Sequence, residues 1–422
     1  MNRLCLLSLV FLLLTTTSQA SVTTKPEAWR ADLRYLAGEL PRRHLNFYHD
    51  LAPDEFVRAV EELDAAIPSK SDAEIQISFF RLVAMAKEAH TNVGWSVNGG
   101  FPYFRRLPIS VLWLQDGLYV TGIATQAQAV GRGRLNDRRL LGARLIKIGN
   151  TEIEEAVRRL SVLIARENEY WLHAQLPQYV ITPEILQETG IVENMESIVL
   201  TLELDNGQRL PLALAPVSWT QALTGIASGV RQDVPLYRQN TTVNYWYKWL
   251  EDSRTIWLEY NRCSDLANNP MTNFANEMFR VADDSGATRF VIDLRNNPGG
   301  NSEVIRPIIA GIRNRPWLNQ RGRLYVITGN TTISSGLLCA WDFQNQTNAI
   351  LLGEPTGGKP NSYGNVLTFT LPNSGLTCVY STKYFNLTPS DPVTLFPDVM
   401  MEVKATDYIS RIDPVFNYIL AN

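Results

Sequence analysis

The segment Asn330–Lys359, NTTISSGLLCAWDFQNQTNAILLGEPTGGK, says more about the fold than any other part of the chain. The β-branched and aromatic run Arg323–Thr328 before it predicts a buried strand, which a glycine and an asparagine end. Ser334 and Ser335 then stand where an apolar helix begins, and Ala349–Gly353 predicts a second buried strand. We therefore expect a strand–helix–strand unit with two serines at the first turn of its helix.

The two serines have an ordinary interpretation and a functional one. A serine at a helix N-terminus usually caps the helix by accepting a hydrogen bond from a free backbone N–H. In the functional interpretation one serine is a nucleophile, and the helix dipole and free amides stabilise an oxyanion. Lys359 offers a similar choice. A lysine in a glycine-rich turn is most often a solvated surface charge, but a desolvated lysine can act as general base toward a serine.

A polar, glycine-rich turn lies upstream of this unit. Phe290–Arg295 (FVIDLR) predicts a buried strand, the turn Asn296–Gly300 (NNPGG) follows it, and Ser302–Arg313 predicts a helix. Such a turn exposes backbone N–H groups, which suits an oxyanion hole or an anion site. The turn lacks the lysine–serine pair of a P-loop and the GxGxxG spacing, so a phosphate site is not indicated.

Three segments in this order resemble the core signatures of the S41 serine peptidases, the family of the C-terminal processing (tail-specific) proteases and the tricorn core protease. They are DLRNNPGG, TTISSG and GEPTGGK, and the resemblance is strong over roughly the last 180 residues. It implies an α/β fold with a crotonase/ClpP-like βα-superhelix as catalytic core. It also implies that Ser334 is the nucleophile, Lys359 a candidate base, and Gly299 and the amide of Ser335 the oxyanion donors.

The resemblance leaves two candidates for the general base. Leu337 and Tyr363 stand where the tail-specific proteases carry a glutamate and a glutamine, which weakens the serine–lysine alternative. The triplet AHT around His90 resembles the signature of tricorn-like relatives, in which a histidine is the base, although a histidine at a helix end is more often a capping or surface residue. Asp391 matches the position of their glutamate. We expect His90 as base, Asp391 orienting it, and Lys359 shaping the site.

The chain before the catalytic core divides into three predicted segments. Residues 1–20 contain an arginine, an eleven-residue apolar run and Ser-Gln-Ala, and they predict a secretory signal peptide cleaved after Ala20. Residues 21–98 predict a helical segment. Residues 99–215 are β-rich and loosely similar to the PDZ-like module that S41 proteins carry, the alternative being a plain β module without peptide binding. Residues 216–422 are the predicted S41 peptidase core.

Specific elements are predicted within the two middle segments. The helices expected in residues 21–98 are Trp29–Leu40, Pro53–Ile67 and Asp72–Glu88. The β-rich module is expected to contain the strands Leu118–Ile123 and Ile198–Leu204 and the helix Ile153–Leu160.

Composition excludes several classes of function. The net charge is −3 and no basic or acidic block occurs, so nothing indicates nucleic-acid or membrane-surface binding. The apolar run near the N-terminus is too short for a stable membrane anchor. Cys263, Cys339 and Cys378 do not make a disulfide framework, although pairing of Cys263 with Cys378 stays open. No segment has metal-ligand spacing, so we expect neither metal nor cofactor.

These observations predict a secreted or periplasmic serine-type endopeptidase that hydrolyses peptide or protein substrates through an acyl-enzyme on Ser334. The alternative is a catalytically inactive peptide- or lipid-binding protein on the same fold. The physiological substrate and the oligomeric state are not indicated by the sequence.

Overall fold

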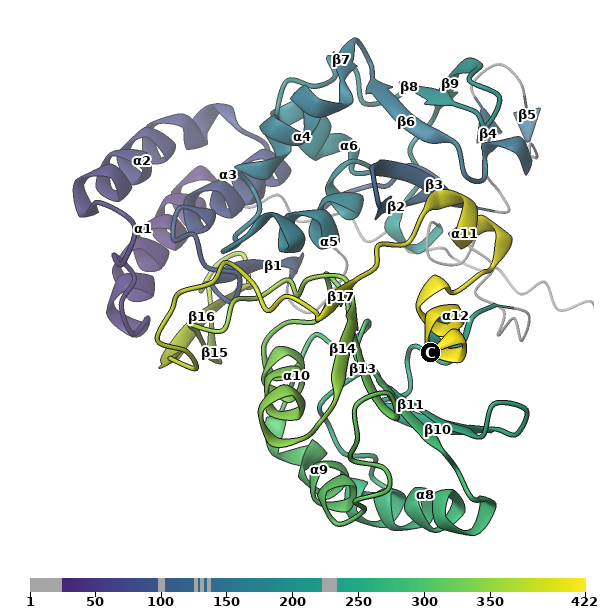
Figure 1. Ribbon diagram of the computed structural model, residues 1–422. Helices are drawn as coiled ribbons and strands as arrows, with labels where there is room; N and C mark the ends of the chain where they lie inside the picture. The colour runs from purple at the N-terminus through teal and green to yellow at the C-terminus, as the bar shows by residue number, and fades with distance from the viewer. Residues whose placement is uncertain (1–24, 98–102, 125–127, 130–132, 135–137, 222–233) are drawn as a thin grey trace, which may run out of the picture.

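The computed structural model describes residues 25–97, 103–124, 128–129, 133–134, 138–221 and 234–422. The predicted signal peptide lies outside the described residues. Figure 1 shows two bodies, one containing the N-terminal helices and a β-rich layer, the other a twisted sheet with helices on both faces. No described helix combines the length and the apolar character needed to cross a membrane.

The N-terminal segment is helical as predicted. It forms α1 (Pro26–Arg43), α2 (Pro53–Ala66) and α3 (Asp72–Ala84). Ser71 and Glu74 make a reciprocal capping box that starts α3, each satisfying a free backbone N–H of the other. The helix ends four residues before the predicted Glu88, so the segment around His90 is a turn that leads into strand β1 (Asn92–Val97).

The second segment is a β-rich layer with three helices. Its strands are β2 (Ile109–Leu114), β3 (Gly117–Ile123), β4 (Gln128–Ala129), β5 (Gly133–Arg134), β6 (Arg144–Ile148), β7 (Thr151–Glu152), β8 (Ile198–Glu203) and β9 (Arg209–Leu214). They form one sheet in the order β2-β3-β6-β8-β9-β4-β5, with β7 paired to β6. Its helices are α4 (Ile153–Ser161), α5 (Glu169–Tyr179) and α6 (Pro183–Glu188). The strands and the helix predicted here are confirmed.

The core contains a six-stranded sheet. Its order is β10 (Tyr245–Leu250), β11 (Thr255–Tyr260), β12 (Arg289–Asp293), β13 (Leu324–Thr328), β14 (Ile350–Gly353) and β17 (Val399–Met400). Only β10 runs antiparallel to its neighbour. The inner strands β11 and β13 are buried along their whole length, as expected for a parallel sheet covered on both faces.

Helices cover both faces of this sheet (Figure 1). One face packs on α8 (Met271–Ser285), α9 (Arg306–Arg313) and α10 (Ser335–Gln346), and the other on α12 (Pro414–Ala421), which follows the short α11 (Ala405–Ser410). The mixed α/β class predicted from the sequence is confirmed. Because β12, β13 and β14 are parallel neighbours, the three segments that follow them meet at one edge of the sheet.

One prediction about this sheet is wrong. The sequence also predicts strands at Val366–Leu371 and Thr377–Ser381 within the core segment. They exist as the hairpin β15 (Ser362–Thr370) and β16 (Leu376–Phe385), but they do not join the core sheet. They form a separate antiparallel sheet in the order β1-β16-β15. Side chains of β16 alternate between buried and partly exposed positions, which suits a sheet with one covered face.

The hairpin belongs to the apolar core of the N-terminal body. Phe369, Leu376 and Tyr380 lie in the same buried cluster as the N-terminal helices. Asp32 of α1 strengthens the contact by accepting hydrogen bonds from the backbone N–H groups of Asn373 (2.9 Å) and Ser374 (2.7 Å) in the hairpin turn. The predicted segment boundaries at residues 98 and 215 stay predictions. The buried cluster contains residues from the segments on both sides of each boundary.

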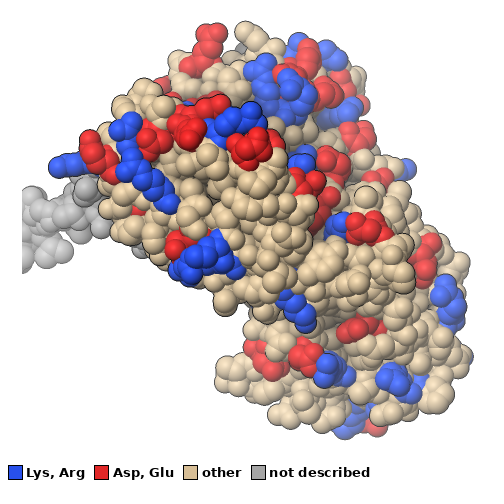
Figure 2. Space-filling model, turned by 90° about the vertical axis from the view of Figure 1, so that its left-hand side faces the viewer, with Lys and Arg blue, Asp and Glu red and all other residues tan. Residues whose placement is uncertain are grey.

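Charged side chains do not gather into a single-sign patch on the face shown in Figure 2. Acidic and basic residues are interspersed there, with broad uncharged surface between them. This distribution agrees with the small net charge of the chain.

Candidate active site

Ser334 occupies a strained turn at the start of α10. Its backbone angles are φ 56° and ψ −131°, a region that residues other than glycine rarely adopt. The turn follows the end of β13, so Ser334 stands at the edge of the sheet where the motifs converge. Such strain costs about 1–3 kcal/mol and persists only where surrounding structure enforces it, commonly at functional sites.

The glycine-rich loop after β12 lies directly against this turn. A Cβ atom on Gly299 would lie 2.7 Å from Ser334 Cβ and 3.1 Å from Ser334 Oγ. A Cβ on Gly300 would lie 2.3 Å from the carbonyl oxygen of Cys263. Both glycines have positive φ, 108° and 133°. Only glycine fits at these two positions, and the predicted juxtaposition of this loop with Ser334 is present.

Asn297 holds the loop in this conformation. Its side chain donates to the carbonyl of Tyr260 (2.7 Å) and accepts from the N–H of Gly299 (2.9 Å). The Gly299 amide, named from the sequence as an oxyanion donor, therefore already has an acceptor. The amide of Ser335 donates to no described group, as expected for the first turn of a helix.

The two adjacent serines have different surroundings. Ser335 is buried, and its Oγ donates a hydrogen bond of 2.7 Å to the carbonyl of Gly300. That bond ties α10 to the glycine loop. Ser334 is only partly buried and its Oγ makes no hydrogen bond to a described residue. Of the two hydroxyls, Ser334 is the one available to a substrate.

His90 lies in the turn after α3 with its ring largely buried. Glu88 Oε1 lies 3.4 Å from His90 Nδ1, close enough for an ion pair but without hydrogen-bond geometry, and accepts from the His90 backbone N–H at 2.9 Å. Burial alone would lower the pKa of His90, but Glu88 and Glu167 outweigh burial and raise it. A raised pKa makes His90 a better proton acceptor.

A buried network fixes Glu88. The His44 Nε2–H donates to Glu88 Oε2 at 3.2 Å, because His44 Nδ1 accepts from the backbone N–H of Asn46 and so carries no proton. Ser381 Oγ, on β16, donates to Glu88 Oε1 at 3.0 Å. Burial would raise the pKa of Glu88, but its bonds to His44 and His90 lower it to about 2. Glu88 is therefore ionised and fixed beside His90.

Glu167 approaches His90 from the β-rich segment, where it stands just before α5. Both of its carboxylate oxygens are buried and accept no hydrogen bond from a described group. Burial raises the pKa of Glu167 to about 7; the charge of Glu88 adds to this effect and that of His90 opposes it. Next in the chain, Asn168 caps α5 and donates to the carbonyl of Gly358 (3.3 Å), so the β-rich segment contributes directly to this site.

Lys359 and Asp391 pair with each other. Lys359 Nζ donates to Asp391 Oδ2 at 2.8 Å, with the lysine side chain 22% exposed and the aspartate 60% exposed. No ion pair joins Asp391 to His90 within the described ranges. The interpretation that Asp391 orients His90 therefore does not match the observed contacts, because Lys359 takes that carboxylate at the rim of the site.

One cavity of 600 Å³ brings the candidate residues together. Ser334, Ser335, His90 and Lys359 all line it. The rest of its wall is largely apolar, with contributions from six elements or loops: Trp171, Pro298, Ile333, Leu338, Val366 and Phe385. An elongated apolar chain with a reactive carbonyl could be held there beside Ser334.

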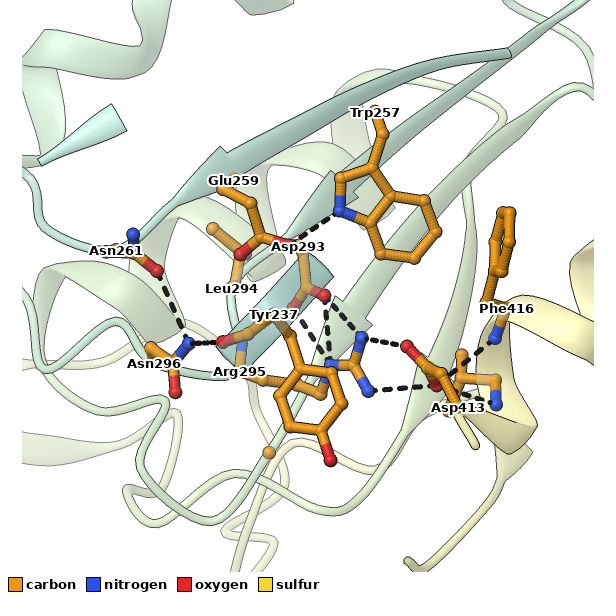
Figure 3. Close-up of polar contacts among 12 residues, drawn as sticks. Tyr237, Trp257, Glu259, Asn261, Asp293, Leu294, Arg295, Asn296, Asp413 and Phe416 are labelled. Atoms are coloured by element: carbon orange, nitrogen blue, oxygen red, sulfur yellow. Dashed lines mark hydrogen bonds and ion pairs between the residues drawn. The ribbon is translucent and has the colours of Figure 1, made fainter. Parts of the chain in front are cut away.

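A buried ionic cluster, which we term the arginine cluster, lies where the glycine loop leaves β12 (Figure 3). It consists of Asp293, Arg295 and Asp413. Arg295 Nε donates to Asp293 Oδ1 at 3.0 Å, and Arg295 Nη1 and Nη2 donate to the two oxygens of Asp413 at 3.1 and 2.7 Å. Burial alone would lower the pKa of Arg295. The charges and hydrogen bonds of Asp293 and Asp413 have the larger effect and raise it well above its ordinary value.

The arginine cluster also joins the loop to the end of the chain that covers the sheet. Asp413 caps α12 by accepting from the backbone N–H groups of Val415 (3.0 Å) and Phe416 (3.2 Å). The ring of Tyr237 lies 3.9 Å from the Arg295 guanidinium and closes the cluster. Such a bidentate arrangement fixes position as well as charge.

The cysteines are free thiols. Cys263 and Cys339 have their sulfur atoms 3.7 Å apart beneath the glycine loop, while Cys378 lies in the hairpin. The open question of a bond between Cys263 and Cys378 is thus answered in the negative for this structure.

Sequence reasoning missed Glu88 and Glu167. Glu88 stands two residues before His90, which is a signal that could have been used. Glu167 is separated from His90 by 77 residues, and nothing in its neighbourhood, Arg-Glu-Asn-Glu, distinguishes it from a surface charge.

No protein-family model and no curated protein matches the chain. Solved structures do match. A crystal structure of a serine-to-alanine mutant of CPAF matches with TM-score 0.62 and 11% identity, covering 93% of this chain and 96% of that one. Mature CPAF complexed with lactacystin matches with a TM-score of 0.60 and 11% identity, covering 93% of this chain and 97% of that one. The photosystem II D1 C-terminal processing protease gives a TM-score of 0.36 at 12% identity, covering 89% of this chain and 92% of that one. The chain therefore has the fold of CPAF along nearly its whole described length.

Proposed function

We propose that this protein is a serine-type endopeptidase of the S41 type that hydrolyses peptide bonds through an acyl-enzyme on Ser334. One observation carries the proposal: the strained Ser334 turn lies against the Gly299 loop and shares a cavity with His90. The three ordered sequence signatures and the CPAF fold support it. The catalytic core corresponds to a crotonase/ClpP-like superhelix in this proposal.

His90 acts as the general base. It takes the Ser334 proton as Oγ attacks the substrate carbonyl carbon, and it passes that proton to the leaving amine when the peptide C–N bond breaks. Water then repeats the sequence and releases the acyl group. Glu88 orients the imidazole in place of Asp391, since its carboxylate is ionised and lies beside Nδ1. The Lys359 ammonium is engaged by Asp391 and shapes the rim.

The oxyanion is bound by the amide of Ser335 and by the glycine loop. The Ser335 N–H is free at the N-terminus of α10, where the helix dipole also favours negative charge. The Gly299 N–H becomes the second donor by exchanging Asn297 Oδ1 for the substrate oxygen. Its position against Ser334 supports this role.

A fluorophosphonate probe tests the nucleophile. We expect covalent labelling of the wild-type protein and of Ser335→Ala, and none of Ser334→Ala. Ser335→Ala is a demanding control because it loses the bond to Gly300, so its fold is checked by thermal unfolding. An inert wild-type protein that cleaves no peptide and instead binds a peptide or a lipid would favour the alternative, an inactive binding protein on this fold.

The β-rich segment acts as a PDZ-like module that presents peptides to the site. In such modules a peptide adds a strand to the sheet edge and backbone amides capture its C-terminal carboxylate. Strand β2 lies at one edge of the eight-stranded sheet, and its outer side pairs with no described strand. This free edge supports the proposed role. Cleavage of one peptide with a free or an amidated C-terminus tests it, and equal rates would remove the module from substrate recognition.

The protein is exported in this proposal, to the periplasm or the medium. Residues 1–20 support this location. Expression of the whole sequence in a bacterium, followed by N-terminal sequencing of the product, should yield a chain that begins after Ala20. A cytoplasmic product that retains the segment would contradict it.

A further inference from the structure

The residues around the proposed base also have the composition of a metal site. Glu88, His90 and Glu167, which we term the histidine cluster, each offer a ligand atom, and these atoms all lie within 4.8 Å of one another. They come from the turn after α3 and the segment before α5, so two parts of the fold hold them in place.

Buried unpaired groups in the histidine cluster call for a further partner. Both oxygens of Glu167 and both ring nitrogens of His90 are buried without a hydrogen bond to a described residue. Leaving a buried polar group unpaired costs about 1–3 kcal/mol, more for a charged one. The oxygens of Glu88 are already bonded to His44 and Ser381, but a carboxylate has about four lone-pair sites and can accept another contact.

We propose that the histidine cluster binds one zinc-class divalent cation and that occupancy inactivates the enzyme. An imidazole with two carboxylates suits Zn²⁺, whereas Mg²⁺ and Ca²⁺ prefer ligands that are all oxygen. Zinc bonds of about 2.0–2.2 Å require ligand atoms nearer together than 4.8 Å, and rotations of the unbonded Glu167 and His90 side chains close that gap.

The ion has its own entrance. Glu88 and Glu167 line a second cavity of 830 Å³, whereas His90 and Ser334 line the 600 Å³ cavity. The histidine cluster therefore forms part of the wall between the two. Six carboxylates and four Lys or Arg side chains line the second cavity, and this excess of acidic groups favours cation entry. Zinc would reach His90 without passing through the peptide-binding cavity.

The inhibitory consequence rests on the proposed function. A His90 ring nitrogen whose lone pair binds zinc cannot accept the Ser334 proton. The bound ion also fixes the orientation of the imidazole ring. Because the ion enters through the second cavity and not the 600 Å³ one, we expect zinc to lower kcat and leave KM nearly unchanged. Chelation should restore activity.

Binding is tested first without any need for activity. Full-length mature protein carrying Ser334→Ala is dialysed against Zn²⁺, and against Mg²⁺ as a comparison. We expect one Zn²⁺ per chain, at least about tenfold weaker affinity after Glu167→Gln, and unchanged affinity after Glu154→Gln, which removes an exposed charge on α4 that lines neither cavity. Equal zinc affinity in all three proteins, or no zinc binding, overturns the proposal.

A second measurement uses the protein without a substitution at Glu167, in case that variant does not fold. Diethylpyrocarbonate modifies histidine rings, and peptide mass analysis reports on His90 separately from the other three histidines. Zinc should protect His90 and leave exposed His49 reactive. Modification of His90 at the same rate with and without zinc overturns the proposal. Failure of the peptidase proposal would appear as an inactive protein that still binds zinc, so the two outcomes are distinguishable.

Discussion

The arginine cluster and the histidine cluster are both buried sets of charges, but they differ in how completely their groups are paired. In the arginine cluster every guanidinium nitrogen of Arg295 donates to Asp293 or Asp413, and Asp413 also caps a helix. In the histidine cluster the oxygens of Glu167 and the ring nitrogens of His90 have no hydrogen-bond partner among described residues.

This difference separates a structural role from a chemical one. A fully bonded buried network holds backbone in place and has nothing left to offer a ligand. A partly bonded one keeps donors and acceptors ready for a proton, a substrate or an ion, at a cost to stability. The four predictions below test this distinction, beginning with the largest expected effect.

Removing the charge of the arginine cluster should destabilise the whole core. Arg295→Met leaves two buried aspartates without a cation, and breaking such a pair costs about 3–5 kcal/mol. Urea unfolding followed by fluorescence measures the loss. The matched control is Arg313→Met on the exposed side of α9, which should cost less than about 0.5 kcal/mol. A loss below 1 kcal/mol for Arg295→Met would mean that the cluster is not a structural support.

Removing the imidazole of His90 from the histidine cluster should lower the catalytic rate and not the stability of the fold. We expect His90→Ala to lower kcat/KM for a peptide substrate by roughly 10²–10⁴-fold, the usual contribution of a general base. Stability should change little or rise, because His90 has few bonds to lose. Near-normal activity in His90→Ala, together with an inactive Lys359→Ala, would make Lys359 the base.

The third prediction concerns pH and the carboxyl group next to the arginine cluster. Glu259 accepts from Trp257 Nε1 at 2.6 Å (Figure 3), and burial together with the charge of Asp293 raises its pKa well above the ordinary value. The folded protein therefore holds a proton on Glu259 that the unfolded chain releases above about pH 4.5, so stability falls as pH rises past that value.

Glu259→Gln should remove this dependence. A glutamine keeps the acceptor for Trp257 and needs no proton, so the variant should exceed the wild type in stability by at least about 1 kcal/mol at pH 8. The advantage should vanish near pH 4. Unfolding midpoints across this range measure it, and an advantage that is equal at both pH values would show that Glu259 does not titrate in this way.

The smallest effect is expected at the rim. Asp391→Asn removes the partner of Lys359 in an exposed pair, and such pairs contribute about 0–1 kcal/mol. We expect no more than a few-fold change in kcat/KM. A loss comparable to that of His90→Ala would return Asp391 to the orienting role that the sequence suggested.

The features predicted well from the sequence are those set by local pattern. The buried strands Leu324–Thr328 and Ile350–Gly353 begin one residue after the predicted starts and end where predicted, because continuous apolar runs between turn residues are strong signals. The order of parallel strands then brings Ser334 to Gly299. The resemblance implied Ser334 and not Ser335 as the nucleophile, and the bond from Ser335 to Gly300 gives a physical reason for that choice.

The features that were missed depend on contacts between distant parts of the chain. Glu167 lies beside His90 because the start of α5 packs against the turn at Gly358, to which Asn168 donates. Asp391 pairs with Lys359 because of the path of its loop, which no local pattern predicts. The hairpin at 362–385 was placed in the wrong sheet for the same reason. Its alternating strands do not specify which other strand they pair with, and β1 lies about 280 residues before its partner β16 in the chain.

The bond between Arg295 and Asp413 has a consequence for how the protein is made. The two residues are 118 positions apart, so a ribosome adding about 5–20 residues per second delivers Asp413 roughly 6–24 s after Arg295. During that interval Arg295 has Asp293 but not Asp413 as a hydrogen-bond acceptor, so the arginine cluster next to the glycine loop is incomplete. A growing chain therefore carries Ser334 before the glycine loop beside it has its full support, so the proposed active site is completed only when the last helix, α12, is synthesised.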